Sequence, residues 1–100
     1  MVRHVILWQL KDEFSPEEKL AVAKGIKEGL EGLVGQVPGL VSAHVQFEKL
    51  AGCTADVMLD SEFENEDALR AYKDHPAHVA VADGKVRPNV KVRVSMDYIK

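Results

Sequence analysis

The stretch from Tyr72 to His78 holds residue types suited to acid–base chemistry, because it brings a phenol and two imidazoles close together in the sequence. A neutral imidazole, with an ordinary pKa near ~6.5, can remove an activated proton near neutral pH. A phenol beside it can donate a hydrogen bond to an oxygen on which negative charge develops. Tyr72 lies one helical turn before His75, and Pro76 lies between the two histidines. These residue types are those of a general acid–base site, provided that a cavity lies next to them.

Residues of the predicted strands are expected to form such a cavity between the sheet and the helices. His4 lies on the helix-facing side of residues 2–10, and the segment that follows Tyr72 is expected to pack over the same side. Ligand pockets commonly combine apolar walls with a few polar groups. The polar groups expected here are those of His4, Tyr72, His75 and His78. The apolar walls expected around them are Ile6, Trp8, Val57, Leu59 and Val92.

Two other interpretations of the same residues remain open. The first is structural: His75 and His78 flank a helix break at Pro76, where imidazoles can bond free backbone groups, and Tyr72 can be a core residue. The second is metal binding by the two histidines, for which a third ligand is needed. The candidates for that ligand are Asp74, Asp83 and His4. Because no accompanying motif supports the pair, we predict that the protein binds no metal and needs no cofactor.

The composition is typical of one globular domain over residues 1–100. Hydrophobic residues make up 46% of the chain and charged residues 29%, which argues against disorder. The net charge of −3 leaves no basic stripe, so no nucleic-acid partner is expected. No stretch reaches the ~18 apolar residues of a membrane span, and the apolar run near residue 5 is expected to be a strand and not part of a secretory signal. The single cysteine, Cys53, excludes an internal disulfide and fits a cytoplasmic location.

The elements that must position these residues alternate between strands and helices. The predicted strands are residues 2–10, 40–47, 55–63 and 90–99. A helix begins after Ser15, which forms a capping box with Glu18, and we expect it to end at Gly35 or at Pro38-Gly39. A second helix covers residues 64–75. A short helix around residues 77–83 follows the break at Pro76 and is expected to end near Gly84.

This order predicts an α+β fold of the ferredoxin-like βαββαβ type, a four-stranded antiparallel sheet with helices on one face. Right-handed crossovers place the first and third strands at the centre of the sheet. The last strand is expected to turn its apolar set toward the helices: Val90, Val92, Val94, Met96 and Tyr98. The apolar residues expected on the open face are Val5, Leu7, Leu40, Met58 and Ile99. Because such a face is unfavourable in water, a second copy of the chain is expected to cover it.

Three segments resemble the Dabb family, the stress-responsive dimeric α/β-barrel domains. They are RHVILWQLK near the start, F-x-x-x-x-A-L-x-x-Y over residues 63–72 and HPAHV over residues 75–79, with a closing DYI. The resemblance spans the whole chain and implies a homodimer whose two sheets form a barrel-like centre. In a plant member, olivetolic acid cyclase, the residues matching His78 and Tyr72 act as base and as polariser of a substrate oxygen. The residue matching His4 lines that enzyme's cavity.

We therefore predict a stress-responsive barrel-domain homodimer that binds a small carbonyl or aromatic compound in a pocket between sheet and helices. His78 and Tyr72 are the predicted catalytic residues. A non-catalytic, stress-associated structural dimer is the main alternative, in which these side chains cap helices and fill the core. A cofactor-free monooxygenase is a further alternative, because similar α/β-barrel dimers oxidise electron-rich aromatic compounds in the same cavity.

Overall fold

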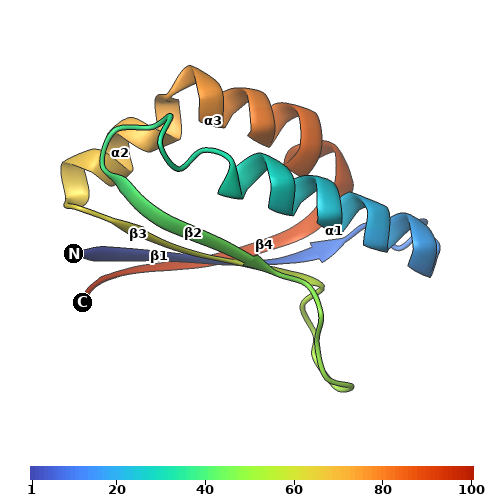
Figure 1. Cartoon of the computed structure of the whole chain (residues 1–100). Coiled ribbons are helices and arrows are strands. Elements are labelled where there is room, and N and C mark those ends of the chain that lie inside the picture. The colour runs from blue at the N-terminus through green and yellow to red at the C-terminus, as the bar shows by residue number, and fades with distance from the viewer.

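In the computed structural model, which describes residues 1–100, helices cover one face of a four-stranded antiparallel sheet (Figure 1). The strands are β1 (Val2–Leu10), β2 (Leu40–Gln46), β3 (Val57–Phe63) and β4 (Val90–Ile99). The helices are α1 (Pro16–Glu31), α2 (Glu66–Asp74) and α3 (Pro76–Val81), followed by the π-helical turn η1 (Ala82–Val86) and the 3-10 turn η2 (Arg87–Asn89). The strand order β2-β3-β1-β4 places β1 and β3 at the centre, which confirms the predicted ferredoxin-like fold. None of the helices is long and apolar enough to cross a membrane.

The start of α1 follows the predicted capping box. Ser15 Oγ accepts a hydrogen bond from the backbone N–H of Glu18 at 3.1 Å, and the Glu18 carboxylate accepts one from the backbone N–H of Ser15 at 2.9 Å. The helix ends at Glu31, earlier than predicted, and a series of turns carries the chain to β2. The buried side of α1 lies on the sheet, where Ile26 of the helix and Phe63 of β3 are both 0% exposed. Each such buried side chain contributes about 1.5–3 kcal/mol of hydrophobic free energy.

Strand β4 turns toward the helices the face opposite to the one predicted. Arg93 pairs with Trp8 and Asp97 pairs with His4, so these two polar residues share the helix-facing side with the buried residues of β1. A register shift between Gln9 and Leu10 leaves only the first apolar residue of β4 on that side. The others lie on the open face, between 40% and 69% exposed: Val92, Val94, Met96 and Tyr98. Alternation separates the two faces of a strand but does not tell which face the helices cover, and the prediction for β4 is wrong for this reason.

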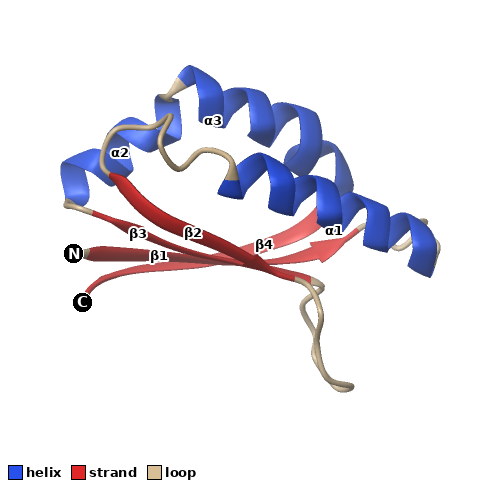
Figure 2. Ribbon diagram, viewed as in Figure 1, coloured by secondary structure: helices blue, strands red, loops and turns tan.

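The open face of the sheet, which no helix covers (Figure 2), is therefore more apolar than predicted. Val5, Leu7 and Met58 lie on it as expected, because they pair with one another or with open-face residues of β4. Leu40 does not: it pairs with Phe63 and is only 7% exposed, beneath the helices. The prediction for Ile99 is also wrong, because it pairs with Val2 on the helix-facing side. Since it lies at the end of the strand, it is nevertheless 73% exposed. The two errors arise from reading each strand without its partner's register.

Candidate functional site

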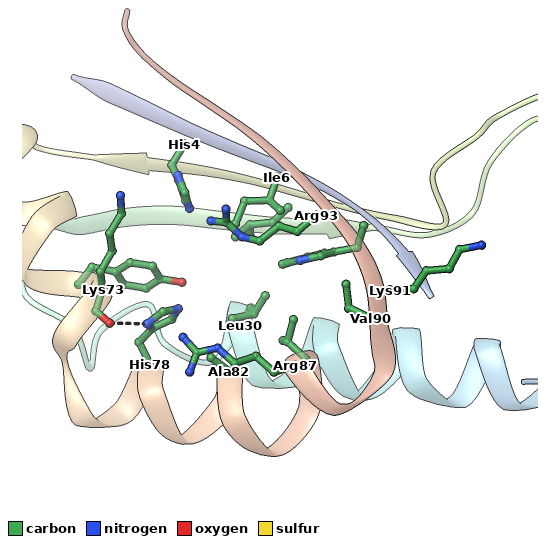
Figure 3. A pocket seen from close by; sticks show the side chains of 14 residues that line it. His4, Ile6, Leu30, Lys73, His78, Ala82, Arg87, Val90, Lys91 and Arg93 are labelled. Atoms are coloured by element: carbon green, nitrogen blue, oxygen red, sulfur yellow. Dashed lines mark hydrogen bonds between the residues drawn. The ribbon is translucent and has the colours of Figure 1, made fainter. Parts of the chain in front are cut away.

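A cavity of about 510 Å³ lies between the helix-facing side of the sheet and the segment from α3 to η2 (Figure 3). This volume lies within the usual range for small-molecule sites. The predicted site residues that line it are His4, Ile6, Trp8, Leu59, Tyr72 and His78. The other lining residues are apolar Leu30, Ala82, Val86 and Val90 and cationic Lys73, Arg87, Lys91 and Arg93. The cavity thus has an apolar interior with titratable and cationic groups on its walls.

His4, on β1, forms the polar part of the sheet wall. Its side chain is 3% exposed, and its Nδ1 is hydrogen-bonded to a carboxylate oxygen of Asp97 on β4. Because an ionised carboxylate can only accept, the imidazole Nδ1 donates, and this fixes the orientation of the ring. The ring points into the cavity (Figure 3). Asp97 also lies 4.0 Å from the ammonium group of Lys73, so three charged or titratable groups meet at this end.

The break between α2 and α3 separates the roles of the two neighbouring histidines. His75 has an extended backbone before Pro76, which is the conformation that a following proline favours. Its Nδ1 accepts a hydrogen bond from the backbone N–H of Ala77 at 3.1 Å and so caps α3. His75 does not line the cavity, contrary to the expectation that it would be one of the polar groups there. The structure thus places this histidine as the structural interpretation predicted, at the start of a helix and outside the pocket.

Tyr72 and His78 lie against each other on the helical side of the cavity. Their ring centroids are 4.1 Å apart with an interplanar angle of 35°. Tyr72 is 3% exposed and packs edge-on against Phe63 at a centroid distance of 4.9 Å, which holds the phenol in place. His78 Nδ1 lies 3.2 Å from the backbone carbonyl of Lys73 (Figure 3). Since a carbonyl can only accept, Nδ1 carries the proton of the neutral ring and Nε2 keeps its lone pair.

Burial shifts the two pKa values in directions that suit acid–base work. It raises the pKa of Tyr72 to about 12, so the phenol stays protonated at neutral pH. Burial also lowers the pKa of His78, and the positive groups of Arg87 and Arg93 act in the same direction, while the bond to the Lys73 carbonyl opposes them. Near neutral pH the site therefore holds a hydrogen-bond donor beside a neutral imidazole.

Two predicted wall residues lie elsewhere. Val57 is 2% exposed and belongs to the hydrophobic core, but it does not line the cavity. Val92 lies on the open face of the sheet for the reason given above. Metal binding also finds no support in the geometry, because no group of three His, Cys, Asp or Glu side chains is arranged to hold an ion.

The sequence reasoning missed the wall formed by η1 and η2. The helix that was expected to end near Gly84 continues as a π-helical turn through Val86 and brings Ala82, Val86 and Arg87 onto the cavity. Such turns often occur at functional sites. The sequence contains a signal for this continuation: the helical apolar spacing extends past Gly84 to Val86, and no proline lies between Pro76 and Pro88. A glycine alone was a poor reason to end the helix there.

Comparison with known proteins gives one family and several similar structures. The model of a family described as the stress responsive A/B barrel domain matches residues 2–100. A dimeric protein of unknown function with a ferredoxin-like fold, from Bacteroides fragilis, is 33% identical, with 97% of this chain and 93% of that chain covered and a TM-score of 0.90. The Arabidopsis thaliana protein At3g17210 is 26% identical, with coverage of 100% and 95% and a TM-score of 0.75.

A hydroxynitrile lyase from Passiflora edulis has the same fold at lower identity. It is 15% identical, with 99% of this chain and 92% of that chain covered and a TM-score of 0.78. No curated protein matches the sequence significantly.

Proposed function

The chain belongs to the family of stress responsive A/B barrel domains, and from this premise we propose that it forms a homodimer that binds a small carbonyl or aromatic compound in each subunit. The observation that carries the proposal is the pair of Tyr72 and His78 at the wall of a cavity of about 510 Å³, with their ring centroids 4.1 Å apart. The apolar interior suits a ring or an alkyl chain, and the phenol and imidazole suit a carbonyl oxygen and an acidic proton. Ile6, Trp8 and Leu59 would hold the apolar body of the compound.

The open face of the sheet supports the homodimer. Leu7, Val94 and Met96 are 40%, 59% and 69% exposed there, and a contiguous apolar face of this kind is unfavourable in water. A second copy offers the same face, so the two sheets would cover each other symmetrically. The similar protein from Bacteroides fragilis is described as dimeric. Light scattering at micromolar concentration tests this part, and a stable monomer contradicts it.

The chemistry proposed for the site is proton transfer next to a carbonyl group. His78 Nε2 takes the proton from the carbon beside the carbonyl, and the electron pair of that C–H bond moves into the enolate. The Tyr72 hydroxyl donates a hydrogen bond to the enolate oxygen and stabilises its charge. The reaction is completed in one of two ways: His78 returns the proton to carbon, or the enolate carbon attacks a second carbonyl, whose oxygen then takes the proton from His78. No cofactor takes part in these steps.

A second candidate function is that of a non-catalytic structural dimer. The observation in its favour is that His75 caps α3 and that Tyr72 packs on Phe63, so both residues also have structural roles. In this case the cavity would bind no carbonyl or aromatic compound, and substitution of His78 would change nothing but stability.

Deuterium exchange tests the two candidates directly. NMR follows the incorporation of deuterium next to the carbonyl of 2-acetonaphthone, a ketone with a bicyclic aromatic ring, with wild type and variants. We expect wild type to accelerate exchange and His78→Ala to lose this acceleration by about 10²-fold or more. Tyr72→Phe is expected to slow exchange while it preserves the ring packing. His75→Asn is the matched control, because asparagine also caps helices and the residue lies outside the cavity.

The outcomes separate the candidates. Exchange that needs His78 but not His75 supports acid–base catalysis. Binding of aromatic ketones without exchange limits the function to ligand binding. If neither binding nor exchange occurs across a panel of ketones and aromatic compounds, the structural dimer is the better description.

A further inference from the structure

Four cationic side chains line the cavity, and three of them have a carboxylate partner. The pairs are Lys91 with Asp12, Arg87 with Asp83 and Lys73 with Asp97. Arg93 forms no ion pair, and its one side-chain hydrogen bond goes to the hydroxyl of Ser95 at 3.3 Å. A guanidinium group has five N–H donors, so most of the donors of Arg93 remain free for a ligand.

The reversed face of β4 is what brings Arg93 to the cavity. Because Arg93 pairs with Trp8, its side chain rises from the helix-facing side of the sheet. Arg87 extends from η2 on the opposite wall, and Figure 3 shows both guanidinium groups pointing into the same space, with that of Arg87 beside His78. The pair between Arg87 and Asp83 is solvent-exposed, with 65% and 55% of the two side chains accessible. Exposed pairs of this kind are weak, so Arg87 can turn to a ligand at little cost.

We infer that the ligand of this cavity carries a carboxylate group, bound by Arg93 and assisted by Arg87, with its apolar body against Ile6 and Trp8. This inference rests on the proposed function, since it names the class of compound for the same site. Arginine binds carboxylates with two parallel hydrogen bonds, which gives both affinity and orientation. A singly charged group suits the site better than a phosphate, because the carboxylate of Asp97 is hydrogen-bonded to His4, which lines the cavity, and adds negative charge at that end.

The binding of a carboxylate also orients the ligand toward the acid–base pair. With the anionic end held between Arg93 and Arg87, the rest of a small compound lies within reach of His78, beside which Arg87 is placed. A neutral compound of the same shape has no such anchor. Arg93 is therefore a specificity residue for the site, and the reaction does not require it as acid or base.

A matched pair of probes tests the inference. 2-Naphthoate and 2-naphthamide have the same ring and differ in charge, and both are titrated into the protein while amide NMR signals report binding. Wild type is expected to bind 2-naphthoate about tenfold more tightly than 2-naphthamide, the size of effect that one charge-assisted hydrogen bond typically gives. In Arg93→Met we expect this preference to disappear while 2-naphthamide still binds. Thermal unfolding of each variant shows that the fold is kept.

Two further variants act as controls. Lys91→Met removes a cation whose side chain points away from Arg93 and Arg87 (Figure 3) and is paired with Asp12, and it is expected to keep the preference for the acid. Arg93→Lys keeps the charge without the planar fork and is expected to retain only part of the preference. Because Arg93 lies on an exposed edge strand, we expect both Arg93 variants to fold with little loss of stability.

Each remaining outcome overturns the inference. Equal affinity of wild type for both probes contradicts the inference that the ligand carries a carboxylate group, but it leaves the proposed binding function intact. The same holds if Arg93→Met binds 2-naphthoate as wild type does. If wild type binds neither probe, the inference fails, and the panel of ketones and aromatic compounds described above decides separately whether the proposed binding function stands.

Discussion

The helices meet the sheet in two different ways at its two sides. Around Ile26, Phe63 and Leu33 the contact is solid: Ile26 of α1 and Phe63 of β3 are 0% exposed, and Leu33, just beyond the helix, is 2% exposed. Near α3 and η1 a cavity of about 510 Å³ remains between helix and sheet. Both contacts belong to the same small protein and the same sheet, so the difference must come from the side chains that each surface presents.

Size and polarity of the facing residues account for the difference. Part of the helix side of the cavity consists of small Ala82 and polar His78, whereas the solid contact is made by Ile26 of α1, a large aliphatic residue. The sheet side has Arg93, and Asp97 is hydrogen-bonded to the lining residue His4, because β4 turns its polar set toward the helices. Such residues cannot be packed dry without loss of hydration, so a void with polar walls is favoured there. A binding site can thus be built where an edge strand presents its polar face to a covering helix.

A pair of leucine truncations compares the two contacts. These substitutions have the largest expected effect on the free energy of unfolding. Leu33→Ala in the solid region is expected to lower the free energy of unfolding by about 3–5 kcal/mol, because it leaves a new cavity. Leu30→Ala is expected to lower it by about 1–2 kcal/mol less, since one side of Leu30 already faces the existing cavity and has fewer contacts to lose. Urea unfolding gives both values. Equal losses would mean that the wall at Leu30 is packed as tightly as the core.

A substitution that fills the cavity tests whether open space exists between α3, η1 and the sheet. Ala82→Leu adds volume where space exists, so we expect the affinity for 2-naphthoate to fall at least about tenfold while the free energy of unfolding changes by less than about 1 kcal/mol. Ala80→Leu, on the exposed side of α3, is the matched control and should leave both quantities unchanged. Isothermal titration and urea unfolding provide the measurements. Strong destabilisation by Ala82→Leu, with Ala80→Leu tolerated, would contradict an open cavity.

The pH dependence of stability gives the smallest of the three effects. The pKa of His78 lies below its ordinary 6.5 in the folded protein, mainly through burial, so the unfolded chain binds this proton more readily. The contribution of His78 to stability is therefore complete above pH 6.5 and is lost as the pH falls through the folded pKa. His78→Gln should make stability less dependent on pH over this range, as measured by urea unfolding at several pH values.

NMR titration of the His78 ring checks the same shift directly. A midpoint below 6.5 is expected in the folded protein. A midpoint above that value would mean that a nearby negative charge outweighs burial at the site, and the neutral imidazole required of a base would then be lost near neutral pH.

Part of the candidate site follows from local sequence rules, and part does not. Tyr72 and His78 reach the cavity because helical spacing and the break at Pro76 orient them, which a local reading can anticipate. His75 caps a helix instead, and the spacing of the two histidines was compatible with either role. Arg93 and Asp97 were assigned to the wrong face, because the apolar alternation of β4 matched a helix-covered strand equally well.

The order of the elements, the capping of α1 and the central position of β1 and β3 could all be predicted from the sequence. These depend on local signals: helical and strand periodicity, the box formed by Ser15 and Glu18, and apolar residues on both faces of β1. Two features depend on how distant segments come together: which side of β4 faces the helices, and where helix and sheet leave a void. Register across strands and the fit of side chains from distant segments set these features, and neither quantity is contained in the periodicity of a single segment.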